Sequence, residues 1–351
     1  MIANMEIIRL LVLAAVAFIV AMILTPAVTA ILYKYHLGVS VRDEGSTPIY
    51  SKLHKNKSGT PTMGGVIIWI TLLIIMGLMY LVSGWSVLPG WIRQLNFFSR
   101  SETLLPLGVL VSSALVGLID DIFNVRRRGG GQGGGMTVKH RLVLYTLIAT
   151  VGALWFYFKL DWDLLHIPFL GEFSLGPWYI LVFIFIIVAT AFSVNETDGL
   201  DGLAGGVLLS CFASFAAIAL LSGKYDLAAF CAVIIGGLLA FLWFNINPAR
   251  FFMGDTGAMS LGITLGVVAL LTQSALLLPV IGLVFLFESL SVIIQLTSKK
   301  LFKRKIFLST PIHHHFEAIG WPEPKVVMRF WVISGVAAVL GLIIAILDKT
   351  L

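Results

Sequence analysis

Carboxylates and an amide lie close together in one short stretch of this sequence, residues 195–206, between two long apolar runs. The stretch begins with Asn195 and contains Glu196, Asp198 and Asp201. Ionised groups at the mouth of a membrane segment are costly unless they face water, a cation or a partner. The glycines that follow let the backbone turn and approach a ligand closely. We therefore interpret the stretch as a functional site rather than as a solvated acidic turn.

Two adjacent carboxylates, Asp120 and Asp121, end the third apolar run. At the carboxyl end of a helix they face the unfavourable pole of the helix dipole, and they also repel each other. A divalent cation would relieve both costs, and Mg²⁺ is typically held by one or two carboxylates together with substrate phosphates. The alternative is an acidic helix end that water solvates.

A further acid, Asp255, lies among glycines where the eighth apolar run begins. An aspartate at a helix start is often only an N-cap. Here it follows Asn245 and Asn247, whose amides suit a base or a ribose. Together with the other acids, Asp255 indicates a metal-binding and nucleotide-binding pocket.

Three consecutive histidines, His313, His314 and His315, lie in the last polar segment. Consecutive side chains on a helix cannot all aim at one point, which argues against a complete tetrahedral zinc site. We interpret them as hydrogen-bond donors to a phosphate, with a zinc site or a pH-responsive surface as alternatives. Glu288, inside the ninth run, is either a structural hydrogen-bonding group or part of a lipid path.

Residues 55–65 lead into the second apolar run and place Lys55 and Lys57 before a Gly-Thr-Pro-Thr segment. Lysines before a helix start could present ammonium groups and backbone N–H groups to an anion. The order of residues is not that of a P-loop. On its own this segment is a weak signal.

The composition of the chain indicates the class of protein to which these residues belong. The chain has 351 residues, of which 58% are hydrophobic and only 12% are charged, and its mean hydropathy is +0.98. Soluble domains carry about 25% charged residues. A membrane span needs about 20 apolar residues, and the candidates are 7–33, 66–82, 103–119, 142–158, 178–194, 203–221, 228–244, 258–271, 275–296 and 330–347. We predict an all-α polytopic membrane protein with about ten transmembrane helices in one domain, residues 1–351.

Basic residues set the expected orientation. Roughly 18 of the 24 lysines and arginines fall on one face of this arrangement, which the positive-inside rule places in the cytoplasm. Both termini are then outside, and the acidic clusters lie on the cytoplasmic face. The net charge of +6 reflects this orientation rather than binding to nucleic acid. Cys211 and Cys231 lie in apolar runs and are expected to be packing residues.

These motifs match a known family. The chain resembles the bacterial phospho-N-acetylmuramoyl-pentapeptide transferases, within the polytopic polyprenyl-phosphate N-acetylhexosamine-1-phosphate transferases. The matching segments follow the family order over nearly the whole chain: 60–65, 120–121, 195–204, 244–245, 253–255 and 311–317. The first and last of these segments are the most specific to this branch.

The resemblance implies a ten-span α-helical homodimer in the bacterial cytoplasmic (inner) membrane. It implies Mg²⁺-dependent transfer of phospho-MurNAc-pentapeptide from UDP-MurNAc-pentapeptide to undecaprenyl phosphate, which yields lipid I and UMP. This is the first membrane step of peptidoglycan synthesis. The resemblance also implies nucleoside antibiotics as inhibitors and no nucleic-acid partner.

The resemblance assigns roles by position. Metal binding falls to Asp255, Asp120 and Asp121, and catalysis to these three with His313, His314 and His315. Substrate binding falls to Lys55, Lys57, Thr60, Thr62, Lys139, Arg141, Asn195, Asp198, Gly199, Leu200, Asp201, Asn245 and Phe252. Arg141 stands where the family commonly has lysine, and Glu196 where it usually has an apolar residue.

Two other functions fit part of this inventory. A sibling enzyme that transfers GlcNAc-1-phosphate to the same lipid shares the acids, but the three histidines and residues 60–65 argue against it. A proton-coupled transporter would need polar residues near the middle of the membrane and inverted repeats. The acids instead concentrate at one face, and no repeat is evident.

Overall fold

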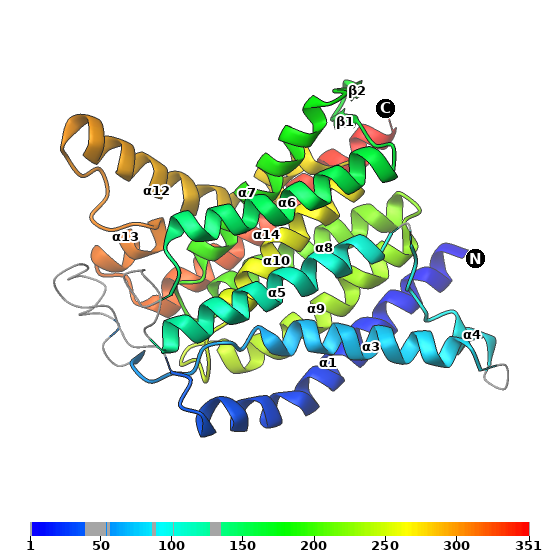
Figure 1. Ribbon diagram of the computed structural model, residues 1–351, viewed down its shortest axis with the longest axis horizontal. Helices are drawn as coiled ribbons and strands as arrows, with labels where there is room; N and C mark the ends of the chain where they lie inside the picture. The colour runs from blue at the N-terminus through cyan, green and yellow to red at the C-terminus, as the bar shows by residue number, and fades with distance from the viewer. Residues whose placement is uncertain are drawn as a thin grey trace.

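The computed structural model describes residues 2–38, 54, 57–85, 89–100, 102–126 and 135–350, and most of them are helical (Figure 1). The long helices are α1 (Ile2–Lys34), α3 (Val66–Ser83), α5 (Leu104–Val125), α6 (Val138–Lys159), α7 (Trp178–Thr197), α8 (Leu203–Leu221), α9 (Tyr225–Asn245), α10 (Asp255–Leu271), α12 (Leu283–Phe302) and α14 (Glu323–Thr350). The shorter elements are α4 (Gly90–Arg93), η2 (Ala275–Leu277), α11 (Leu278–Ile281), α13 (Ile312–Ala318) and the strands β1 (Leu164–Ile167) and β2 (Gly171–Ser174).

Each predicted apolar run coincides with helical structure. Among the described residues, eight helices are long and apolar enough to cross a membrane. The eighth run forms α10, which has only 17 residues. The ninth run is not one straight span, because α11 and α12 meet at an angle of 83°. An all-α polytopic membrane protein is therefore confirmed, with a broken helix where we predicted a continuous one.

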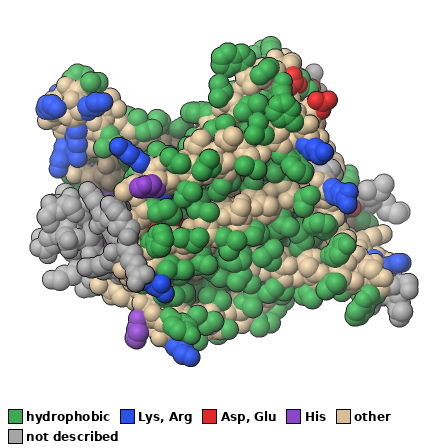
Figure 2. Space-filling model, in the orientation of Figure 1, with side chains coloured by type: hydrophobic (Ala, Val, Ile, Leu, Met, Phe, Trp, Pro, Cys, Tyr) green, Lys and Arg blue, Asp and Glu red, His purple; other side chains and the backbone are tan. Residues whose placement is uncertain are grey.

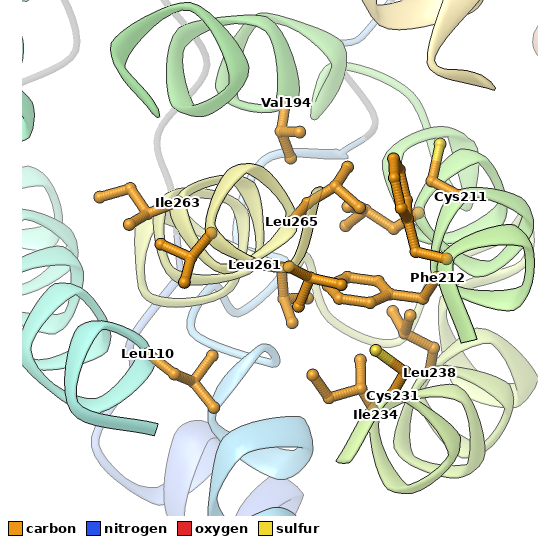
Figure 3. Close-up of a cluster of buried hydrophobic side chains, with 14 of the residues drawn as sticks. Leu110, Val194, Cys211, Phe212, Cys231, Ile234, Leu238, Leu261, Ile263 and Leu265 are labelled. Carbon is orange, nitrogen blue, oxygen red and sulfur yellow. The ribbon is translucent and has the colours of Figure 1, made fainter. Parts of the chain in front are cut away.

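The centre of the bundle is α10. All of its residues are buried, as expected for a helix that is apolar on every side. It packs against α5, α7 and α8, and Figure 3 shows neighbouring side chains around it: Leu110, Val194, Phe212 and Ile234. A Cβ on Gly117 of α5 would lie 2.4 Å from the carbonyl oxygen of Asp255. Small residues allow such close helix contacts, and this one holds the start of α10 in the protein interior.

The outer surface is apolar, as a lipid-facing surface must be. Large hydrophobic side chains point outward along most of the long helices; Ile23 of α1 and Phe185 of α7 are each 71% exposed. Figure 2 shows such side chains spread over the broad face of the bundle, with lysine and arginine mostly at its edges. The N-terminus and C-terminus lie at the same end of the bundle, opposite α13 (Figure 1).

A short β-hairpin interrupts the series of helices. Between α6 and α7 the strands β1 and β2 form an antiparallel hairpin. The hairpin is attached to the end of α14, because the carboxylate of Asp348 accepts the backbone N–H of Phe169 at 2.6 Å and faces Nε2 of His166 at 2.6 Å. Phe169, in the turn between the strands, has a φ of 65°. The prediction of an all-α protein did not include this hairpin.

Candidate functional site

Four helices bring their side chains together at the start of α10. The guanidinium of Arg141, from α6, donates from Nε to Asp120 Oδ2 at 2.7 Å and from Nη1 to Asn195 Oδ1 at 3.0 Å. Its Nη2 lies 2.9 Å from Asp255 Oδ2. The amide of Asn195 also donates to Asp255 Oδ1 at 2.5 Å. One cationic group thus joins two carboxylates that lie far apart in the sequence.

Asp121 acts as a cap for α10 from a different helix. The first N–H groups of a helix have no partner within it. The two carboxylate oxygens of Asp121 accept the N–H groups of Asp255 and Thr256, each at 3.0 Å. The side chain is buried, being only 1% exposed. Asp121 therefore positions Asp255, and any contact with a metal would add to this structural role.

Asp198 reaches the same point from the loop after α7. Its carboxylate accepts the N–H of Gly254 at 3.2 Å. Burial, and then the nearby charge of Asp255, raise the pKa of Asp198 to about 7. Gly254 has a φ of 74°, and a Cβ there would lie 2.6 Å from Thr62 Oγ1. The acids at 120, 121, 198 and 255 thus converge, and a divalent cation beside them would favour the ionised form of Asp198.

Asp201, in contrast, is satisfied by the protein. Its carboxylate accepts from Lys57 Nζ at 2.6 Å, Asn247 Nδ2 at 2.9 Å and the N–H of Ala249 at 3.1 Å. Lys57 also donates to Glu323 at 2.5 Å. Burial alone would lower the pKa of Lys57, but the carboxylates of Glu323 and Asp201 outweigh it and raise that pKa. Glu323 was not predicted as a site residue, because it precedes an apolar run like any solvated helix start.

Asn245 also supports the fold. Its Oδ1 accepts the N–H of Gly202 at 2.9 Å, and its Nδ2 donates to the carbonyl of Phe251 at 2.7 Å. Trp331 of α14 holds the same turn by donating to the carbonyl of Gly202 at 3.0 Å. Asn245 is 4% exposed. Its role is to shape the loop that carries residues 198–202.

The three histidines diverge, as helix geometry requires. Nδ1 of His313 lies 2.9 Å from Glu288 Oε2, and Nδ1 of His314 lies 2.7 Å from Glu317 Oε2. His315 is the third, and its Nδ1 accepts the N–H of Leu308 at 3.2 Å. Glu288 is therefore a hydrogen-bonding partner for His313. The opposite nitrogen of His313, Nε2, is buried without a hydrogen-bond partner among the described residues.

Their protonation states differ as well. Burial alone would lower the pKa of His313, but the carboxylate of Glu288 raises it above its ordinary value. Burial, and then the neighbouring His313, lower the pKa of His314 to about 3, so this ring is neutral at physiological pH. Burial opposes ionisation of Glu317, but its hydrogen bonds with His314 and His54 lower its pKa to about 2.

The remaining predicted substrate-binding residues differ in how deeply they are buried and in which groups they contact. Thr62 is buried, with Oγ1 3.4 Å from Asp121 Oδ1, and Lys57 Nζ lies 5.8 Å from the ring centroid of partly buried Phe252. Thr60 is partly buried, and Leu200 is 4% exposed. Lys139 is exposed and has no polar partner within the part of the chain that the structure describes. Lys55 lies outside the described residues.

A substitution at Gly199 tests whether the contact between the acidic loop and His313 matters for turnover. A Cβ at this position would lie 2.4 Å from Nε2 of His313, a separation that requires the ring to move. We expect Gly199→Ala to lower turnover at least about tenfold, because a shift of this size in a positioning group is costly. The control is Gly77→Ala on α3, where a Cβ meets nothing within 4 Å. Equal turnover rates for the two variants would show that the position of the His313 ring does not affect the reaction.

Comparisons with known proteins identify relatives of this chain. Residues 103–273 match the family model for glycosyl transferase family 4, and residues 57–68 match signature 1 of phospho-N-acetylmuramoyl-pentapeptide-transferase. The chain is 40% identical to the phospho-N-acetylmuramoyl-pentapeptide-transferase of Chloroflexus aggregans, over 97% of this chain and 90% of that protein. It is 38% identical to the enzymes of the same name from Anoxybacillus flavithermus (95% of this chain, 97% of that protein) and Bacillus anthracis (96% and 98%).

Proposed function

The chain belongs to the phospho-N-acetylmuramoyl-pentapeptide transferase family, and from this premise we propose its reaction. It transfers phospho-MurNAc-pentapeptide from UDP-MurNAc-pentapeptide to undecaprenyl phosphate, and the products are lipid I and UMP. The protein is a multi-pass protein of the bacterial inner membrane. The observation that carries the proposal is the 40% identity with a relative of this name over 97% of the chain.

The acidic pocket fits a magnesium ion. Arg141 bridges Asp120 and Asp255 with contacts of 2.7 and 2.9 Å, so their carboxylates are close enough to share a cation. Oxygen ligands of this kind suit Mg²⁺. Asp255 and Asp120 would hold the ion, with Asp121 supporting Asp255 from behind. When bound, the ion would supply positive charge to neutralise the phosphates.

The protein's own residues would align the reactants. The lipid phosphate oxygen attacks the sugar-linked phosphorus, the bond from that phosphorus to the bridging oxygen breaks, and UMP leaves with that oxygen. A phosphate monoester has a second pKa near 6, so the nucleophile is already largely ionised at neutral pH. Charge neutralisation and in-line alignment therefore matter more than a strong base. Arg141, with its planar set of donors, is placed to hold a phosphate.

Membership of this family also implies how the helices are oriented in the membrane. The cytoplasmic face would contain the acidic pocket, and both termini would lie outside. The position of both termini at one end of the bundle supports an even number of crossings (Figure 1). We propose ten, with α10 and the bent pair α11–α12 counted as spans, and a homodimer as the assembly. Nucleoside antibiotics would inhibit by occupying the nucleoside pocket near Asp198.

The test is UMP release by the purified protein. We expect release only when both Mg²⁺ and undecaprenyl phosphate are present, with UDP-MurNAc-pentapeptide as the donor. UDP-GlcNAc is the comparison donor and should release no UMP. Equal rates with the two donors would favour a GlcNAc-1-phosphate transferase instead. UMP release that does not depend on the lipid phosphate would contradict the proposal.

A further inference from the structure

A second polar cluster, built from His54, His314 and Glu317, lies beside the histidine segment. One carboxylate oxygen, Glu317 Oε2, faces two imidazole nitrogens: Nε2 of His54 at 3.1 Å and Nδ1 of His314 at 2.7 Å. All three ligand atoms lie within 4.8 Å of one another. The side chains are 2%, 11% and 5% exposed. Two nitrogens and one oxygen thus converge on a single buried point.

The spacing of these atoms is close to that of a metal site. In a tetrahedral zinc site the bonds are about 2.0–2.1 Å long, so the ligand atoms lie about 3.3 Å apart. The two nitrogen–oxygen separations, 2.7 and 3.1 Å, would need to open by about 0.6 and 0.2 Å, and the two nitrogens lie within 4.8 Å of each other. An ionised carboxylate only accepts hydrogen bonds, so without a metal both facing nitrogens carry protons. A cation would take the position of those protons.

We propose that His54, His314 and Glu317 bind a divalent transition metal, and that this metal is Zn²⁺. Two imidazoles and one carboxylate suit zinc, whereas Mg²⁺ prefers oxygen ligands alone. The ligand atoms of this cluster come from His54, His314 and Glu317, whereas Asp120 and Asp255 share Arg141. The proposed zinc site therefore uses a different set of residues from the proposed magnesium site. A water molecule or a further ligand would complete the tetrahedron.

The metal would join two distant segments of the chain. His54 and Glu317 are 263 residues apart in the sequence. The carbonyl of His54 accepts the N–H of Lys57 at 3.0 Å, and the side chain of Lys57 contacts Asp201. Glu317 lies on α13, which also carries His313. Zinc would thus fix the segment before α3 against α13, on the side where Lys57 and His313 reach the acidic loop.

The test measures metal content in the full-length protein, purified in detergent with an affinity tag that contains no histidine. Inductively coupled plasma mass spectrometry after incubation with Zn²⁺ and gel filtration should find about one zinc per chain. We expect His54→Gln and Glu317→Gln to retain at least tenfold less zinc. His315→Gln is the matched control, because its ring bonds to the N–H of Leu308 instead, and it should retain the metal.

Two further measurements guard against loss of folding. His54→Cys supplies a thiolate ligand and should recover the zinc that His54→Gln loses. Zinc should raise the thermal unfolding temperature of the unmodified protein and of His54→Cys, because a ligand that binds only the folded state stabilises it. No bound zinc in the unmodified protein, or equal zinc in the protein and in His54→Gln, would overturn the proposal. Metal content needs no substrate, so this result is independent of the proposed reaction.

Discussion

Replacement of Asp255 by asparagine is expected to lower the rate of UMP release about 10³-fold at a fixed Mg²⁺ concentration. Losing one well-placed electrostatic group at a reacting centre typically lowers the rate 10²–10³-fold. Here the loss would also weaken the binding of Mg²⁺. Asparagine has the same shape, and its Oδ1 can still accept from Asn195, which now contacts Asp255 at 2.5 Å. The backbone N–H of residue 255 still reaches Asp121. The change therefore keeps the shape but removes the charge and the ion pair with Arg141, whose Nη2 now lies 2.9 Å from Asp255 Oδ2.

The matched control is Asp226→Asn, at the start of α9. Asp226 also pairs with an arginine, Arg9, at 2.7 Å, but at the opposite end of the helix from Asn245. We expect this variant to keep most of its activity. Steady-state UMP release should be measured for both variants over a range of Mg²⁺ concentrations. Near-normal turnover in Asp255→Asn would show that Asp255 is not a metal ligand.

Much of the framework follows from the sequence, because a membrane protein obeys simple rules. Backbone polar groups must be satisfied within each span, so apolar runs become helices. Charges are costly in the membrane, so the acids collect at helix ends and in the loops between spans. The positions of Asp120, Asp198 and Asp255 at such ends were therefore enough to predict one shared pocket. The contacts around Gly254 agree with that prediction.

The roles of single side chains depend on which helices are neighbours, and one sequence does not reveal this. Asp121 caps α10, which begins 134 residues later. Asn245 holds a turn 43 residues before it. Glu317 has a partner, His54, 263 residues away. The 83° bend before α12 is another such feature, because the apolar run continues through it and only Pro279 and Gly282 mark it locally.

Arg141 gives the second large effect. We expect Arg141→Met to lower turnover about 100-fold and, at the same time, to lower the Mg²⁺ concentration needed for half-maximal activity. The guanidinium now occupies the carboxylates of Asp120 and Asp255, at 2.7 and 2.9 Å. Two unit charges about 4 Å apart interact by about 4 kcal/mol at an effective dielectric constant of 20. Removal of this cation therefore leaves a more negative pocket, which binds Mg²⁺ more tightly but holds the phosphate less well.

The stability of the Arg141 variants separates charge from geometry. The Arg141 side chain is 24% exposed, so its ion pairs are partly buried, and removing one partner leaves the two carboxylates with an uncompensated charge. Without Mg²⁺ the methionine variant should therefore unfold at a lower temperature, and Mg²⁺ should restore the unfolding temperature. Arg141→Lys keeps the charge but loses the planar fork; its Mg²⁺ requirement should stay near normal while turnover falls. Lys299→Met, at the exposed end of α12, controls for the loss of one positive charge. If Arg141→Met instead needed more Mg²⁺ than the unmodified protein, Arg141 would serve to order the metal ligands rather than compete for them.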